Sequence, residues 1–193
     1  VYWRAQYTGD TLNNSAVSPC VPLIIRSAPT LTLSLSPSAP VAGDSVGGTA
    51  VLAGGVSAPG GTVTYTVYTD TACTTQIIPA RTSTKTVVNG AVPVSNAFAF
   101  DQAGIWYWKA AYSGDTYNGS AASACVRLTV DKATPILDLE QSPNPVGIGD
   151  TVATSVELEA TSPDPSGTAK VSAYTDISCT QPVSYIPVYS TSL

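Results

Sequence analysis

The sequence predicts an all-β fold, and three observations support this prediction. First, apolar and polar residues alternate in short stretches such as residues 31–35 (LTLSL) and 63–67 (VTYTV), which places every second side chain on one face of a strand. Second, the chain contains 15 Gly and 15 Pro, which divide these stretches into segments bounded by turns. Third, the abundant Val and Thr favour strands, and no long stretch has the apolar period of a helix.

The composition excludes several classes of partner. Hydrophobic residues make up 44% of the 193 residues, which is enough to bury a core. Only 11% of the residues are charged and the net charge is -5, so we expect no basic surface for nucleic acid or anionic lipid. No apolar run approaches the roughly 20 residues that cross a bilayer, so we expect no membrane insertion by this segment.

An internal repeat of 105 to 106 residues organises the chain. The segment YTGDTLNNSAVSPC at residues 7–20 returns 105 residues later as YSGDTYNGSAASAC at residues 112–125. The segment VYTDTACT at residues 67–74 returns 106 residues later as AYTDISCT at residues 173–180. The chain therefore contains parts of more than one copy of the same unit.

This period divides the chain into three parts. Residues 1–27 correspond to the C-terminal part of one repeat, residues 28–131 to a complete repeat and residues 132–193 to the N-terminal part of a further repeat. The connections RSAP at residues 26–29 and DKATP at residues 131–135 are short and contain Pro, so we expect successive repeats to be held stiffly. The start, VYWRAQYTGD, is neither a signal peptide nor an initiator Met, so we expect the sequence to be part of a longer chain.

The complete repeat has the strand content of a β-sandwich. Besides the two stretches named above, strands are expected at residues 82–88, 97–100, 105–112 and 126–130, with a turn at Asn89-Gly90. About seven strands in about 105 residues is the size of an immunoglobulin-like sandwich.

An aromatic strand, a Gly-Asp turn and two cysteine positions together carry a family resemblance. The segment DQAGIWYWKAAYSGDTYNGSAASAC at residues 101–125, followed by VRLTV and preceded by VYTDTACT, resembles the tandem immunoglobulin-like repeats of large bacterial and archaeal surface proteins. The resemblance covers the whole chain in three pieces and implies a β-sandwich that extends a surface protein, fibre or adhesin. The cysteines stand elsewhere than in antibody domains, so that core disulfide is not carried over, and a transthyretin-like strand order is the alternative.

The four cysteines and the absence of His predict an oxidising, extracellular or cell-surface environment. Cys73 and Cys125 lie 52 residues apart within the complete repeat, and we expect them to form a disulfide. Cys20 and Cys179 belong to the incomplete repeats, and we expect each to pair with its equivalent in an adjacent repeat or a neighbouring chain. The apolar positions after Cys125 place it on the outward side, so the bridge is expected to join a loop to a strand. Without His or a Cys-x-x-Cys motif, neither a zinc site nor a cysteine nucleophile is expected.

The two Tyr-x-Gly-Asp segments are typical of turns, in which Gly supplies a positive φ and Asp caps the turn through the backbone. A calcium site is the alternative interpretation, because Ca²⁺ is bound by carboxylate and carbonyl oxygens. Its candidate ligands are Asp44, Asp70, Asp101 and Asp115. No other cofactor is expected.

Asn13 and Asn118 each begin an N-glycosylation sequon, and they occupy equivalent positions of the repeat. Glycan modification is therefore one interpretation, and an unmodified polar turn is the other.

The aromatic strand is predicted to belong to the core. Trp106, Trp108, Ala110 and Tyr112 share one face of it, as buried residues of a central strand do, whereas Tyr107 lies on the opposite face. A sugar-binding aromatic face is the alternative.

These features predict a non-enzymatic structural protein. The absence of His rules out Ser-His-Asp and Cys-His arrangements, and we expect no catalytic residues. We expect a structural repeat of an extracellular stalk, fibre or filament whose partners are neighbouring repeats or identical subunits. The alternative is an adhesin module that recognises glycan or protein through the loop at residues 113–124.

Overall fold

The computed structural model describes residues 1–159, 166–183 and 189–192. These residues form strands joined by turns, with no helix among them, which confirms the predicted all-β class. The chain has two compact units. The first contains Val1–Ala39, Ser45–Phe98 and Ile105–Thr129, and the second contains Pro40–Asp44, Ala99–Gly104 and Val130–Leu193.

The boundaries of these units differ from the predicted repeat boundaries, because the first unit includes residues 1–27 and the second includes Ala99–Gly104 and the turn Pro40–Asp44. The backbone N–H of Ala42 donates to Asp131 O at 2.8 Å, and the N–H of Asp131 donates to Pro40 O at 2.9 Å. These hydrogen bonds hold the turn against the chain that follows Val130, which explains why the turn groups with the second unit.

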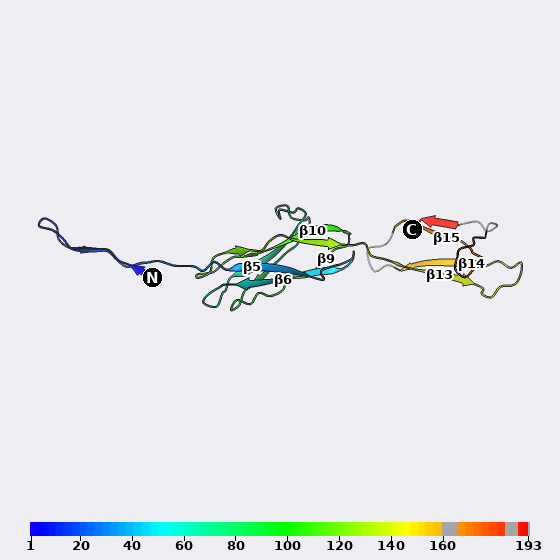
Figure 1. Ribbon diagram of the computed structural model, residues 1–193, viewed down its shortest axis with the longest axis horizontal. Helices are drawn as coiled ribbons and strands as arrows, with labels where there is room; N and C mark the ends of the chain where they lie inside the picture. Colours follow the sequence, from blue (N-terminus) through cyan, green and yellow to red (C-terminus); the bar gives the residue numbers. More distant parts are fainter. Residues whose placement is uncertain (160–165, 184–188, 193) are drawn as a thin grey trace. The chain divides into compact units, whose positions relative to one another are not determined.

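Two sheets occupy the predicted complete repeat, and they are consistent with a β-sandwich (Figure 1). The first has the order β5-β6-β9, and the second has the order β8-β7-β10 with both β11 and β12 paired to β10. The bounds are β5 Thr30–Ser36, β6 Ser45–Ala53, β7 Thr62–Tyr68, β8 Thr82–Thr86, β9 Phe98–Ala99, β10 Gly104–Tyr112, β11 Ala121–Ala122 and β12 Val126–Val130. The strand predicted at residues 82–88 therefore ends two residues earlier, and the one predicted at residues 97–100 is shorter at both ends.

Buried apolar side chains lie at alternating positions of these strands. Trp108 and Ala110 in β10 are fully buried and Tyr112 is 2% exposed. The rings of Phe98 in β9 and Trp108 in β10 lie 5.6 Å apart between centroids, so the two sheets contact each other through aromatic side chains. The further buried apolar residues of the strands are Leu31, Val46, Ala50, Val63, Tyr65, Val67, Leu128 and Val130. The aromatic strand therefore packs in the core through Trp108, Ala110 and Tyr112, as the sequence predicts, whereas Trp106 is only half-buried.

Gly48 in β6 lets the two sheets approach closely. A Cβ atom on Gly48 would lie 3.1 Å from Leu33 Cδ1 and 3.2 Å from Tyr65 Cδ1. The Tyr65 ring cannot retreat freely, because its hydroxyl donates to Pro93 O at 2.8 Å and accepts from Ala50 N at 3.2 Å. A side chain at position 48 would therefore meet a ring whose hydroxyl is held by two hydrogen bonds.

The strand pairings of the complete repeat recur in the C-terminal part. β13 (Ile136–Ser142) pairs with β14 (Ala153–Glu159) in the register Ile136↔Glu159, which is the β5–β6 register Thr30↔Ala53 shifted by 106 residues. β15 (Thr168–Val171) pairs with β16 (Tyr189–Ser192), and this register is that of β7 with β8 shifted by the same number. Part of this predicted repeat fragment, residues 160–165, 184–188 and 193, lies outside the described residues.

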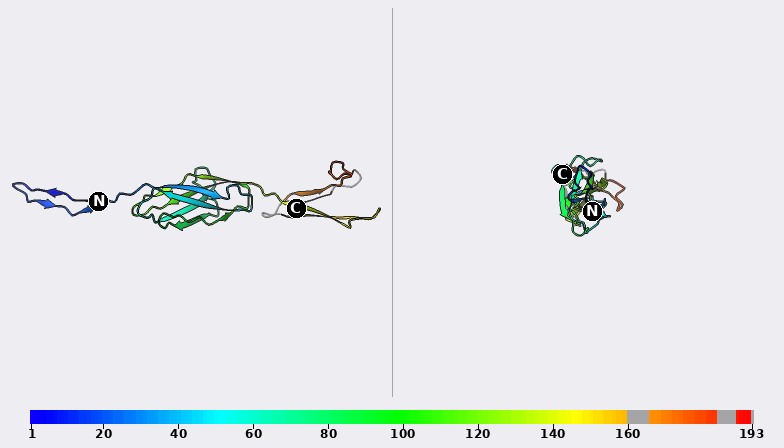
Figure 2. Two further views of the ribbon diagram at one scale, coloured as in Figure 1. Left: turned by 60° about the horizontal axis from the view of Figure 1, so that its bottom comes forward. Right: turned by 90° about the vertical axis from the view of Figure 1, so that its left-hand side faces the viewer.

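The N-terminal part is a two-stranded ribbon (dark blue in Figure 2) that corresponds to the last strands of the complete repeat. β1 (Tyr2–Trp3) pairs with β4 (Val21–Pro22), and β2 (Gln6–Tyr7) pairs with β3 (Ala16–Val17). The register Gln6↔Val17 is the β10–β11 register Ala111↔Ala122 shifted by 105 residues. The ribbon therefore reproduces the local pairing of β10 with β11.

Candidate functional sites: the disulfide and the Asp115 turn

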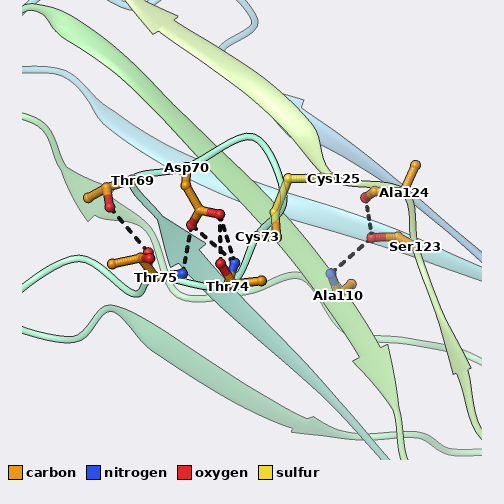
Figure 3. Close-up of a disulfide and its surroundings, with 9 residues drawn as sticks. All are labelled: Thr69, Asp70, Cys73, Thr74, Thr75, Ala110, Ser123, Ala124 and Cys125. Carbon is orange, nitrogen blue, oxygen red and sulfur yellow. Dashed lines mark hydrogen bonds between the residues drawn. A yellow bond between two sulfur atoms is a disulfide. The ribbon is translucent and has the colours of Figure 1, made fainter.

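Cys73 and Cys125 form a disulfide, as the sequence predicts, with their Cα atoms 6.0 Å apart (Figure 3). Cys73 lies in the loop that follows β7, and Cys125 immediately precedes β12. Because β7 and β12 both flank β10 in one sheet, the bridge joins a loop to a strand of the same sheet. The bridge therefore joins a loop to a strand, as expected, although Cys73 is buried and Cys125 is half-buried rather than exposed.

Asp70 shapes the loop that presents Cys73. Its carboxylate accepts hydrogen bonds from the Thr75 N–H at 2.6 Å and from the Thr74 N–H and hydroxyl, as Figure 3 shows. The Thr75 N–H in particular holds the pKa of Asp70 below its usual value of 3.8. The loop also places Cys73 at φ 53°, a left-handed conformation that a non-Gly residue adopts only when its surroundings impose it.

Ser123 interrupts the pairing of β10 just before Cys125. The Ala110 N–H donates to Ser123 Oγ at 3.0 Å instead of to a backbone carbonyl (Figure 3). The Ser123 N–H in turn donates to Ala110 O at 2.9 Å. A side-chain acceptor thus satisfies a buried backbone donor at the point where β11 gives way to β12.

Asp115 caps the turn after β10. Its carboxylate accepts hydrogen bonds from the backbone N–H groups of Gly60 at 2.7 Å and of Tyr117 and Asn118 at 2.8 Å each. Donation by Gly60, supported by the other donors, holds the pKa of Asp115 well below its usual value of 3.8. Gly114 precedes it at φ 78°, so the Gly-Asp pair forms the turn that its sequence predicts.

Asn118 is a buried polar centre beside this turn, and it is fully buried. Its Nδ2 donates to the Asp115 carboxylate at 2.8 Å and to Val56 O at 3.0 Å. Its Oδ1 accepts from the Ser27 hydroxyl at 2.7 Å and from the Val56 N–H at 2.8 Å. One amide therefore connects three segments of the chain.

The burial of Asn118 favours the polar-turn interpretation of this sequon over glycosylation. An oligosaccharyl group would have to reach Nδ2, and that atom is enclosed and engaged in hydrogen bonds. The polar-turn interpretation of this sequon accounts for the structure. Asn13, by contrast, is exposed, so glycosylation there stays a prediction.

The connection before the complete repeat is attached to the same turn. The Ser27 N–H donates to Tyr117 O at 2.8 Å, the Gly119 N–H donates to Ser27 O at 2.9 Å, and Arg26 Nε donates to Thr116 O at 3.2 Å. Asn118 and these backbone bonds together form a joint, which we define as Arg26, Ser27 and residues 115–119. The sequence did not predict that this turn binds the connection, because its Gly-Asp pair indicates only a turn.

Both terminal parts contain copies of these features. The N–H of Leu12, the Tyr7 hydroxyl and Asn13 lower the pKa of Asp10 to about 2. Asp176 accepts from Thr180 and Gln181 as Asp70 accepts from Thr74 and Thr75. Cys20 and Cys179, however, are free and exposed, so the chain itself contains no partner placed against either cysteine among its described residues.

The calcium candidates occupy separate local environments. The carboxylate oxygens of Asp70 and Asp115 accept hydrogen bonds from backbone N–H groups, and Asp44 Oδ2 accepts from the Val41 N–H at 2.9 Å. Asp101 is exposed. In the part of the chain that the structure describes, no three acidic, Cys or His side chains are close enough together to bind a metal ion.

Comparison with known proteins adds no family: no protein-family model and no curated protein matches this sequence. The residues that the structure describes contain no helix of the length and hydropathy needed to cross a membrane. The disulfide is typical of proteins from oxidising environments.

Proposed function

We propose that this chain is a non-enzymatic structural segment of an extracellular stalk, fibre or filament, built from tandem immunoglobulin-like sandwiches. The joint of Arg26, Ser27 and residues 115–119 is the observation that carries this proposal. It attaches an inter-repeat connection to a turn of the sandwich that follows this connection, through three backbone and side-chain bonds besides the Ser27–Asn118 contact. A connection held in this way resists bending, which is what a load-bearing array requires and what a flexible linker lacks.

The strand order supports an immunoglobulin-like sandwich. Its first, second and fifth strands, β5, β6 and β9, share a sheet, and the other strands surround β7 and β10. Constant-type immunoglobulin domains keep the fourth strand with the first sheet, whereas β8 pairs with β7 here. We infer a variant of that sandwich in which the fourth strand has changed sheets.

The loop at residues 113–124 favours this structural role over adhesion. Its polar groups at Asp115, Asn118 and Ser123 are used within the chain, and its N-terminal copy makes the same Asp-centred bonds. A recognition loop would be expected to offer its polar groups outward and to vary between copies.

Electron microscopy of tandem arrays of residues 26–130, which contain the complete joint, tests the proposal. We expect straight rods with a regular axial spacing. Exchanging Arg26 and Ser27 for Ala should widen the distribution of bend angles, because the Arg26 and Ser27 side-chain bonds are lost. Arg127→Ala is the matched control, since Arg127 is exposed on β12. Arrays that are already flexible with the native joint would contradict a load-bearing role.

A further inference from the structure

Two Asn-Gly pairs lie in turns of the complete repeat, and their Asn side chains have opposite environments. Asn89 is exposed, whereas Asn118 is fully buried. The N–H of the following Gly is hydrogen-bonded in both pairs, to Pro59 O at 2.8 Å after Asn89 and to Ser27 O at 2.9 Å after Asn118. The two pairs therefore differ in what surrounds the Asn amide rather than in what holds the backbone of the Gly.

An Asn-Gly pair is prone to spontaneous deamidation, because Gly has no Cβ to hinder the approach of its backbone nitrogen. This nitrogen attacks Cγ of the Asn, and its proton leaves with the Nδ2 group as ammonia, so that a cyclic succinimide forms. Water then adds to one of the two ring carbonyls and breaks the bond from that carbonyl to nitrogen. The product is Asp or isoaspartate, and the reaction consumes only water.

The closed joint opposes each step of this reaction at Asn118. Nδ2 donates to both oxygens of Asp115, at 2.8 and 2.9 Å, and to Val56 O at 3.0 Å, so the leaving group is held in place. Oδ1 accepts from the Ser27 hydroxyl and the Val56 N–H, and these bonds must break before Cγ can turn toward the Gly119 nitrogen. Full burial of the side chain also excludes the water that would open the ring.

Deamidation would in turn prevent the joint from closing again. An aspartate carboxylate at position 118 would present oxygen where Nδ2 now donates, so its contacts with the Asp115 carboxylate and Val56 O would become repulsive. Isoaspartate would also add a methylene to the backbone and displace the Gly119 N–H from Ser27 O. Both products therefore favour the open joint.

We propose that Asn118-Gly119 is a deamidation site that reacts only when the joint of Arg26, Ser27 and residues 115–119 opens, and that the reaction makes the opening permanent. The rate at Asn118 is then the rate of an open Asn-Gly pair multiplied by the fraction of time for which the joint is open. This inference deepens the proposed function and rests on it, because permanent opening of the joint is a loss of stiffness only in a load-bearing array.

The test incubates the full chain and its Arg26→Ala, Ser27→Ala double variant at mildly alkaline pH and follows both Asn-Gly pairs by peptide mass spectrometry. We expect the double variant to deamidate at Asn118 about tenfold faster than the wild type, which corresponds to about 1.4 kcal/mol of lost closure. Asn89 is the internal reference, and its rate should be the same in both chains. Arg127→Ala is the matched control variant, since Arg127 is exposed on β12.

A second measurement tests whether the product holds the joint open. Asn118→Asp should accelerate amide hydrogen exchange at Ser27 and Gly119 by about tenfold or more, because their N–H groups donate across the joint. Asn89→Asp is the matched control and should leave this exchange unchanged. Near-UV circular dichroism shows whether each variant is folded, and the rate comparison decides the proposal by itself if Asn118→Asp does not fold.

Equal deamidation rates at Asn118 in the wild type and the double variant would overturn this proposal. Exchange at Ser27 and Gly119 that stays at the wild-type rate in a folded Asn118→Asp chain would do the same. Neither result touches the proposed function if tandem arrays are straight. Flexible arrays with the native joint would reject the load-bearing role, whatever the reactivity of Asn118.

Discussion

Replacing Gly48 by Ala should destabilise the complete repeat. The added methyl would lie 3.1 Å from Leu33 Cδ1, 3.2 Å from Tyr65 Cδ1 and 3.5 Å from Trp108 Cε3. Leu33 can change rotamer, but Tyr65 is fixed by hydrogen bonds to Pro93 and Ala50. Overpacking of this kind costs about 1–3 kcal/mol.

Gly47 is the matched control for Gly48. A Cβ on Gly47 would meet only Ser95 Oγ, at the ordinary distance of 3.8 Å. Gly47→Ala should therefore leave stability unchanged or raise it by about 0.4–1 kcal/mol, because Ala restricts the unfolded chain more than Gly does. Two adjacent Gly→Ala exchanges are thus expected to shift stability in opposite directions.

Urea unfolding followed by tryptophan fluorescence, with the disulfide intact, measures both effects. The double variant Gly48→Ala, Tyr65→Val adds a coupling test, because removal of the ring relieves the clash. We expect it to lose less stability than the sum of the single variants, by about 0.5–3 kcal/mol. Additive losses, or a Gly48→Ala chain as stable as the wild type, would refute the packing argument.

Three further predictions concern the disulfide and the Asp115 turn. Replacing Cys73 and Cys125 by Ser should lower stability by about 4 kcal/mol on the chain-entropy model for the loop of 52 residues, measured by thermal unfolding. Because the pKa of Asp115 is lowered, the stability it contributes is present above its unfolded value of 3.8 and is lost as the pH falls below that value. The free energy of unfolding should therefore decrease as the pH drops below about 4. Asp115→Asn should make this pH dependence shallower. Asn118→Ala should lower stability by about 1–3 kcal/mol, because the buried groups that Asn118 hydrogen-bonds would lose their partner.

Each of these predictions has a matched control. Cys20→Ser should leave the melting temperature of the complete repeat unchanged, since Cys20 is free. Asp101→Asn should preserve the steepness of the acid transition. If Asp115→Asn had the same pH dependence of stability as the wild type, the result would argue against capping of the turn by Asp115. Asn13→Ala should be neutral where Asn118→Ala is costly, and equal effects would show that burial of Asn118 does not matter.

Local pattern was enough to predict the strands and the disulfide pair. Alternation at residues 31–35 and 63–67 depends only on the period of a strand, and β5 and β7 include these residues. The 52-residue spacing within one repeat selected Cys73 and Cys125. Short strands were placed less well, as at β9, because two residues carry little periodicity.

The role of Asn118 lay beyond sequence reasoning because its partners are distant in the chain. Ser27 lies 91 residues away and Val56 lies 62 residues away. The three residues of a sequon read the same in the sequence whether they are glycosylated or form an unmodified polar turn. Only the packing of the segments around Ser27 and Val56 encloses the Asn118 amide. The same reason hides the need for Gly at position 48, where Leu33 and Tyr65 arrive from other strands.

The sequence by itself therefore determined the strand class, the repeat period and the cysteine correspondence, because each is a property of spacing along one chain. Tertiary structure decided which residue of each repeated pair is buried. Trp108 is buried and Trp3 is exposed although the segments around them are alike. The physical reason is that burial requires facing strands from the same sandwich, and β7 faces β10, whereas the ribbon of β1 to β4 has no such strand among the described residues.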